Sequence, residues 1–366
     1  MNCRNSWAHR HATAILAAHR DGKSPAETMR ETYAAIRAWD DPALFIALRD
    51  EDEAVAAAAA LDPADAARKP LFGAPFAVKD NIDVAGLPTT AACPAFAYAP
   101  TANAFVVQRL IDAGAIPVGK TNLDQFATGL VGVRSPYGTP RNARDAALIP
   151  GGSSSGSASA VAAGLVPFAL GTDTAGSGRV PAALQGITGL KPSLGAISTS
   201  GVVPACRTLD CVSIFAATAA EARAVFDVAQ GFDAADPYAR RLVFDAPGLS
   251  WDRLKLGVPS RATRRFLGDD AAEAAFDATL ARLTTLGAAP CFDDVPPQAL
   301  RRTRRRSSGR RIMRWLVYHA SGGNEVGGVD PEGKGAAVPS ALAAVGQRRE
   351  SECARSWQHD TLSGSR

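Results

Sequence analysis

Histidine is almost missing from this chain of 366 residues and occurs only near its two ends. The five histidines are His9, His11, His19, His319 and His359, so none lies in the 299 positions between the third and the fourth. A Ser-His-Asp site, a Cys-His site or a histidine-rich metal site built in the middle of the chain is therefore excluded. Acid–base chemistry in that region must use Lys, Asp, Glu, Tyr or Cys.

Closely spaced cysteines and long apolar runs are missing as well. The six cysteines have no CxxC spacing, so we expect neither a zinc ribbon nor a dense disulfide scaffold, and a reducing cytoplasm is the expected compartment. The best apolar run, residues 158–171, is shorter than the roughly 18 residues of a membrane helix. The first residues lack the apolar core of a secretory signal. We therefore predict no membrane partner.

Excess positive charge is confined to the last part of the chain. Residues 298–366 carry 12 Arg and 1 Lys against 6 acidic residues, a net charge of +7, whereas residues 1–297 carry a net charge of −3. The main body therefore gives no electrostatic reason to bind nucleic acid. Because Arg/Gly/Ser-rich segments bury too little apolar surface to fold, we predict one domain over 1–297 and an irregular, exposed tail over 298–366.

The main body alternates between helical and strand-like segments. Residues 8–60 have helical spacing, with a helix start at Ser24-Pro25 and an alanine-rich helix over 52–61. From residue 69 onward, the pattern predicts strands over 75–78, 115–118, 254–258 and 288–292, and helices over 104–113, 221–230 and 271–286. Strands and helices joined by short loops indicate an α/β protein with a mixed sheet covered by helices.

Two small-residue segments contain candidate catalytic serines. Residues 150–157 (PGGSSSGS) precede a run of small helical residues and can present free N–H groups to an anion, although a plain linker has the same composition. Ser177 lies 24 positions after Ser153, in a turn that follows the apolar segment 165–170. A strand that ends in such a turn is typical of a nucleophile beside an oxyanion hole, and a structural strand-to-helix turn is the alternative.

A serine nucleophile needs a base, and lysine is the residue type available. Lys79, Lys120 and Lys191 each end an apolar stretch, where burial can lower the pKa of the ammonium group toward neutrality. A lysine at a strand end is also commonly ion-paired or extended toward solvent. From the residues alone, all three lysines stay open as candidates.

Taken together, these segments resemble the amidase signature family. The resemblance covers about residues 10–297 and rests on residues 73–81, 114–116, 119–122, 150–157, 172–181 and 186–192. It implies an α/β amidase signature fold, in which helices cover both faces of a large mixed central β-sheet. It also implies a Ser-Ser-Lys triad, with Ser177 as nucleophile, Ser153 as bridging residue after a cis peptide bond, and Lys79 as base.

The same resemblance implies further roles around the triad. The oxyanion hole is expected from the N–H groups of Thr174, Ala175, Gly176 and Ser177. Ser154 and Ser155 are expected to support the loop by hydrogen bonds, and Asp173 is expected to pair with Arg179. We expect Lys79 and Ser177 to lie about 2.6–3.2 Å from Ser153, or somewhat farther without ligand. No metal or other cofactor is expected.

Within the family, residues 122–138, 172–181 and 203–211 resemble the allophanate hydrolases. Those enzymes cleave the terminal amide of allophanate, H2N-CO-NH-COO⁻, in urea or triazine degradation. The expected partner is therefore a small amide, and a homodimer is left open. The alternatives are another amidase, a non-catalytic truncated remnant and a glutaminyl-tRNA amidotransferase A-type subunit. Such amidotransferase subunits usually carry Gly, Ile and Gln where this chain has Ala175, Gly178 and Val180.

The sequence departs from the allophanate hydrolases after residues 292–296. There, the family has a Tyr and an Arg that hold the substrate carboxylate, and neither is matched in the arginine-rich segment. We interpret residues 298–366 as a shifted reading frame or a degenerate end, and a genuine basic tail that binds an acidic partner is the alternative. Loss of the carboxylate contacts is expected to weaken allophanate binding by roughly 10- to 100-fold or more, leaving little or no hydrolysis.

Overall fold

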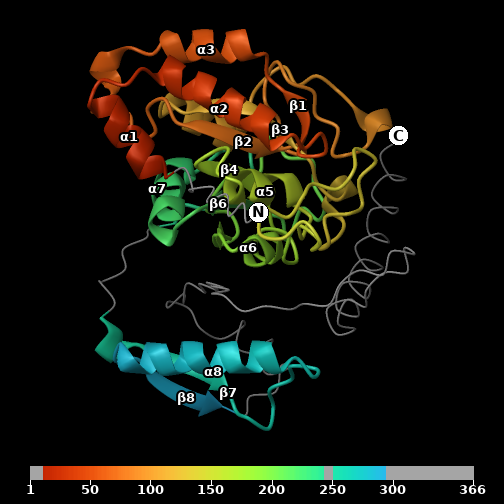
Figure 1. Ribbon diagram of the computed structural model, residues 1–366, viewed down its shortest axis with the longest axis vertical. Helices are drawn as coiled ribbons and strands as arrows, with labels where there is room; N and C mark the ends of the chain where they lie inside the picture. The colour runs from red at the N-terminus through yellow and green to blue at the C-terminus, as the bar shows by residue number, and fades with distance from the viewer. Residues whose placement is uncertain (1–10, 243–249, 294–366) are drawn as a thin grey trace, which may run out of the picture. The chain divides into compact units, whose positions relative to one another are not determined.

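The computed structural model describes residues 11–242 and 250–293 (Figure 1). The chain divides into two compact units, whose described parts are residues 11–241 in the first unit and residues 242 and 250–293 in the second. The predicted tail over 298–366 and its boundary at residue 297 lie outside the described residues. Within the described part, no helix has both the length and the apolar character needed to cross a membrane.

Three helices begin the first unit, namely α1 (Ala12–Arg20), α2 (Pro25–Trp39) and α3 (Glu51–Ala59). The predicted start of α2 is confirmed, because the Ser24 hydroxyl accepts a hydrogen bond from the Ala26 N–H. The helical interpretation of residues 8–60 was wrong at β1 (Phe45–Leu48). This four-residue apolar run has no decisive period, and its antiparallel pairing with a distant strand makes it a strand.

The first unit is built on a six-stranded sheet in the order β1-β3-β2-β4-β6-β5. The further strands are β2 (Pro75–Lys79), β3 (Ile116–Thr121), β4 (Phe168–Thr172), β5 (Thr188–Leu190) and β6 (Val212–Ala216). Strand β2 runs parallel to both β3 and β4, whereas β1, β5 and β6 pair antiparallel with their neighbours. The prediction of a mixed sheet is therefore confirmed.

Helices pack on both faces of this sheet, among them α4 (Phe105–Asp112), α5 (Ser155–Ala162), α6 (Arg179–Gln185) and α7 (Ala219–Ala229). Residues of α2, α3 and α5 share one buried cluster with Ala77 of β2 and Phe215 of β6. Side chains alternate along a strand, so Phe76 faces the other way and stacks on Phe168 with the ring centroids 5.2 Å apart. Helices α4 and α7 contact each other and strands β3 and β6, outside that cluster.

The second unit contains β7 (Lys255–Pro259), α8 (Asp270–Thr285) and β8 (Ala289–Asp293). Both strands and the helix lie within one or two residues of their predicted positions. The strands pair in parallel as a sheet of their own, and the Asp269 carboxylate caps α8 by accepting from the Ala272 N–H. Short 3₁₀ segments complete the described elements of the two units, at Pro63–Asp65, Pro94–Phe96, Gln125–Ala127 and Trp251–Arg253.

Candidate active site

Two neighbouring strands end side by side and place the first two polar groups of the site. Lys79 is the last residue of β2 and Thr172 is the last residue of β4. The two strands are parallel, with Val78 opposite Leu170, so their carboxyl ends meet at the same edge of the sheet. Both strands are buried along their full length, so the polar residues that end them are buried as well.

The candidate bridging serine lies in the loop that leads into α5. The peptide bond between Gly152 and Ser153 is cis, as the resemblance implied. Every residue of α5 is buried, and its small side chains let it approach the sheet closely. At Gly156, a Cβ atom would lie only 2.6 Å from the backbone of both Leu44 and Asn122, so any larger residue would push the helix away. This close packing brings Ser153 over the ends of β2 and β4.

Lys79 joins these elements through two hydrogen bonds. Its Nζ donates to Ser153 Oγ and to Thr172 Oγ1, both at 2.7 Å. Burial lowers the pKa of Lys79 to about 7, against the opposing effect of the carboxylates of Asp124, Asp173 and Asp210. A large fraction of the Lys79 side chain is therefore a neutral amine near pH 7, and a neutral amine can accept a proton.

Ser177 lies in the turn between β4 and α6. Its hydroxyl donates a long hydrogen bond of 3.5 Å to the Gly129 carbonyl oxygen. Among the described residues, Lys79 makes the predicted hydrogen bond to Ser153, whereas no hydrogen bond joins Ser177 to Ser153. The proximity of Ser177 to Ser153 stays a prediction. A serine hydroxyl turns freely about its Cα–Cβ bond, and here the loop carbonyl provides the acceptor.

The turn around Ser177 presents unoccupied backbone donors. The amide N–H groups of Thr174, Ala175, Gly176 and Ser177 have no hydrogen-bond acceptor within the described parts of the chain. The turn is held from both sides. Arg179 donates to Asp173 through Nε at 2.8 Å and Nη2 at 3.0 Å, which confirms the predicted pair, and the Thr174 hydroxyl donates to Asp210. Four successive free N–H groups on a fixed turn can bind a developing oxyanion.

The serines that follow Ser153 make the expected supporting contacts. Ser154 Oγ donates to the Thr172 carbonyl oxygen at 3.1 Å and accepts from the Thr172 N–H at 3.3 Å. Ser155 Oγ donates to the Asn122 carbonyl oxygen at 3.5 Å. The Ser154 contacts tie the loop to the end of β4, and the Ser155 contact ties it to Asn122, directly after β3.

The ammonium groups of the other two candidate lysines, Lys120 and Lys191, bind groups outside the proposed triad. Lys120 Nζ is buried, lies 3.2 Å from Asp80 Oδ1 and donates to Thr89 Oγ1 at 2.8 Å. Lys191 Nζ donates to the Pro192 carbonyl oxygen at 2.8 Å. Neither ammonium group makes a hydrogen bond to Ser153 or Ser177 in the described structure. Within the same residues, no group of three or more His, Cys, Asp or Glu side chains is arranged to hold a metal ion.

Two residues of this site, Thr172 and Asp124, were not predicted as functional from the sequence. Thr172 is the second hydroxyl bound to Lys79, and its position at the end of a strand next to β2 is a signal that could have found it. Asp124 donates its N–H to the Ser153 carbonyl oxygen at 3.0 Å, and its carboxylate accepts from the N–H groups of Gly132 and Arg134 at 3.0 and 2.9 Å. Its position in the sequence gives no comparable signal.

Comparisons with known proteins agree with this geometry. The model of the family described as Amidase matches residues 27–304. The urea amidolyase of Saccharomyces cerevisiae is 65% identical over 159 residues, which are 43% of this chain and 9% of that protein. The A-type subunit of the glutamyl-tRNA(Gln) amidotransferase of Methanosarcina acetivorans is 44% identical over 209 residues, which are 55% of this chain and 42% of that protein.

A solved structure shows the same likeness in three dimensions. The allophanate hydrolase of Kluyveromyces lactis superposes with a TM-score of 0.71 at 40% identity, covering 79% of this chain and 48% of that one. The chain thus spans less than half the length of each of these three relatives.

Proposed function

The chain belongs to the amidase family, and from that premise we propose that it hydrolyses the terminal amide of allophanate with a Ser-Ser-Lys triad. Ser177 is the proposed nucleophile, Ser153 the bridging residue and Lys79 the base. The observation that carries the proposal is the buried Lys79 amine, whose pKa of about 7 and 2.7 Å contact with Ser153 suit a base that works near neutral pH. Without a histidine in this region, lysine takes that role.

In the proposed first half of the reaction, neutral Lys79 takes the proton of Ser153, and Ser153 takes the proton of Ser177. For this step, the Ser177 hydroxyl turns from the Gly129 carbonyl to Ser153, a contact that forms with substrate in place. Ser177 Oγ then attacks the amide carbonyl carbon. The free N–H groups of residues 174–177 stabilise the negative oxygen of the tetrahedral intermediate.

In the second half, the relay returns the proton to the leaving nitrogen, which departs as ammonia while the acyl group stays on Ser177. A water molecule then attacks the acyl carbon, and the same relay accepts its proton and returns one to Ser177 Oγ. The products are the free acid and the original enzyme. Each proton therefore moves through the hydroxyl of Ser153, which is fully buried.

Allophanate is the proposed substrate because an allophanate hydrolase is among the solved structures that are similar to this chain. Identity to the yeast urea amidolyase is higher, at 65%, than the 44% found for the amidotransferase subunit. Cys93, Cys206 and Cys211 are free thiols, and the proposed compartment is the reducing cytoplasm, where thiols stay reduced.

Ammonia release by the purified full chain tests this function. The substrates are allophanate, malonamate, acetamide and glutamine, and circular dichroism first shows that the chain is folded. Ser177→Ala is the inactive variant, with Ser250→Ala as the matched control at an exposed serine. Because the Tyr and Arg that hold the substrate carboxylate in the allophanate hydrolases are not matched in this chain, we expect a low rate of ammonia release. Among the four substrates, allophanate should still give the highest rate, and Ser177→Ala should remove what turnover remains. Preference for glutamine favours the amidotransferase alternative, and a folded chain that releases ammonia from none of the four contradicts the proposal.

A further inference from the structure

Asp124 is a fully buried carboxylate that the proposed proton relay does not use. It follows β3 by three residues and begins the loop that runs to Arg134. Its Oδ2 accepts from the Gly132 N–H at 3.0 Å, and its Oδ1 accepts from the Arg134 N–H at 2.9 Å. A buried carboxylate is costly unless its oxygens are hydrogen-bonded, so the carboxylate and these two donors hold one another in place. The path of the loop is thereby fixed.

This loop carries the acceptor of the proposed nucleophile. The Gly129 carbonyl oxygen accepts from the Ser177 hydroxyl at 3.5 Å. The Asp124 carboxylate packs directly against the same glycine, because a Cβ atom at Gly129 would lie only 2.6 Å from Asp124 Oδ2. A shift of the Asp124 carboxylate would therefore move the carbonyl group that holds Ser177.

Asp124 also contacts the loop of the bridging serine. Its backbone N–H donates to the Ser153 carbonyl oxygen at 3.0 Å. Its Oδ2 lies so close to Gly152 that a Cβ atom there would clash with it. The Gly152 N–H in turn donates to the Leu130 carbonyl oxygen at 2.9 Å, which ties the two loops together. One carboxylate is thus packed between the loop that holds Ser177 and the loop that carries Ser153.

The charge of Asp124 acts on the base as well. Burial lowers the pKa of Lys79 to about 7, and three carboxylates oppose this effect, of which Asp124 has a larger influence than Asp173 or Asp210. The cation on the loop of Asp124, Arg134, is exposed and donates to a carbonyl oxygen of the same loop, so solvent screens its charge. A negative charge near Lys79 stabilises the ammonium form.

We propose that Asp124 is a positioning residue, which holds the nucleophile Ser177 and the bridging Ser153 at the separation that proton transfer requires. The inference rests on the proposed function, because it assigns Asp124 to the relay of that reaction. No hydrogen bond joins the two serines within the described residues, so other contacts must set their separation. Asp124 is bonded to the loops of both. A small displacement of reacting groups lowers a rate strongly, which gives these contacts their importance.

The rate at which Ser177 reacts with phenylmethanesulfonyl fluoride tests this role without an amide substrate. Ser177 Oγ attacks the sulfur and displaces fluoride while its proton passes to the relay, and the mass of the full chain reports the new bond. Asp124→Asn removes the charge and keeps the shape of the side chain. Asp124→Glu keeps the charge and moves the carboxylate by one methylene group. Ser177→Ala gives the background rate.

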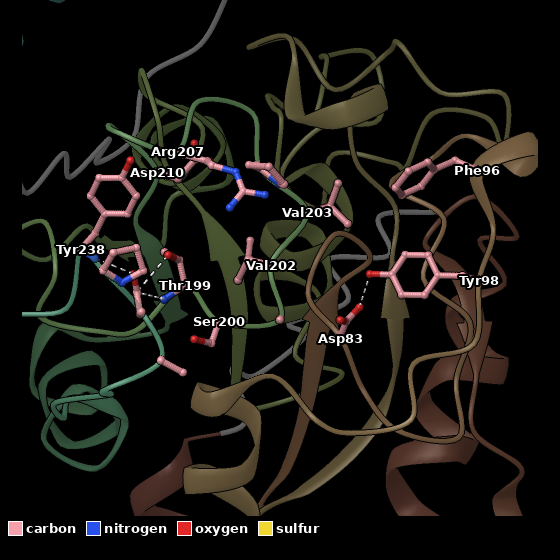
Figure 2. A pocket seen from close by; sticks show the side chains of 15 residues that line it. Asp83, Phe96, Tyr98, Thr199, Ser200, Val202, Val203, Arg207, Asp210 and Tyr238 are labelled. Atoms are coloured by element: carbon pink, nitrogen blue, oxygen red, sulfur yellow. Dashed lines mark hydrogen bonds between the residues drawn. The ribbon is translucent and has the colours of Figure 1, made fainter. Parts of the chain in front are cut away.

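Asp236→Asn is the matched control. Asp236 is also a buried carboxylate that accepts from two backbone N–H groups, those of Thr199 at 2.7 Å and Tyr238 at 2.8 Å. It belongs, with Thr199 and Tyr238, to the lining of a cavity of about 480 Å³ that includes none of the proposed triad residues (Figure 2). The control therefore makes the same chemical change in a loop held outside the triad.

We expect both Asp124 variants to slow the labelling of Ser177 by roughly 10-fold or more, and Asp236→Asn to leave it within about 2-fold. Rates are compared at about pH 9, where the neutral amine of Lys79 prevails. An NMR titration of the Lys79 side chain, assigned by its loss in Lys79→Arg, should have a lower midpoint in Asp124→Asn. In Asp124→Glu, the midpoint should stay close to that of the unchanged chain.

Circular dichroism first shows which variants fold, and either folded Asp124 variant carries the test. Labelling that is unchanged, or slowed no more than in Asp236→Asn, overturns the inference. If neither Asp124 variant folds, the residue serves stability alone, which overturns it too. A folded, unchanged chain in which Ser177 is never labelled has the same consequence.

The two proposals fail separately. Labelling of Ser177 that depends on Asp124, in a chain that releases no ammonia, supports the positioning role and contradicts the hydrolysis. Ammonia release that depends on Ser177 but is equally fast in both Asp124 variants supports the hydrolysis and contradicts the positioning role.

Discussion

Lys79 Nζ lies 2.7 Å from the hydroxyl of Thr172, the same distance that separates it from Ser153. The amine is therefore fixed between two hydroxyls, one on the adjacent strand β4 and one in the loop before α5. Because strand register sets the position of Thr172, the sheet itself orients the base. We assign Thr172 as a positioning residue that acts through Lys79.

Replacing Thr172 by Val is expected to lower kcat/KM for allophanate by about 10-fold, since it removes one hydrogen bond to the base. The lost acceptor stabilised the ammonium form, so the pKa of Lys79 should fall and the acidic limb of the pH profile should move to lower pH. Thr172→Ser should restore most of the activity. If Thr172→Val leaves kcat/KM and the pH profile unchanged, Thr172 contributes to packing alone.

The pH dependence of kcat/KM should report Lys79 directly. Burial lowers the pKa of this lysine to about 7, and the reactive form is the neutral amine. Activity should therefore be high above about pH 7 and fall as the pH drops through that value and the ammonium forms. Initial rates across the pH range, checked for enzyme stability at each pH, give the midpoint. A midpoint at about pH 4, where an ordinary carboxyl titrates, would point to an acidic residue as the base.

The pair of Asp173 and Arg179 should stabilise the oxyanion turn. Asp173 is fully buried, whereas the Arg179 side chain is 39% exposed, so solvent screens part of the interaction. Arg179→Ala leaves the buried carboxylate without its cation and should lower the free energy of unfolding by about 1–3 kcal/mol, with a larger loss in kcat than in substrate affinity. Urea denaturation and steady-state kinetics measure both. In a double-mutant cycle, Asp173→Asn with Arg179→Ala should cost less than the sum of the two single changes.

Gly152 has no room for a side chain. A Cβ atom there would lie 2.6 Å from the backbone nitrogen of Gly132 and would also clash with the Asp124 carboxylate. Gly152→Ala should therefore lower the free energy of unfolding by about 1–3 kcal/mol and reduce turnover by displacing Ser153. Gly257→Ala is the matched control, because a Cβ atom at Gly257 meets nothing within 4 Å. Equal stability of the two variants would show that the loop relaxes without cost.

Much of the architecture follows from local patterns that the sequence carries. The strands over 75–78 and 115–118 and the helices over 104–113, 221–230 and 271–286 all occur close to their predicted bounds, because apolar periodicity and turn residues act over a few positions. Strand β1 was missed for the same reason, since four apolar residues have no decisive period and a partner more than 70 positions away decides their conformation.

The sequence by itself determined which chemical groups are available: serines in two small-residue turns, lysines at strand ends and no central histidine. Only the tertiary structure decided which groups meet. Lys79 is separated by 74 positions from Ser153 and by 93 from Thr172, while Lys120, which looks equivalent in the sequence, is paired with Asp80. Burial and long-range neighbours set the pKa of a lysine, and both arise when distant segments pack together.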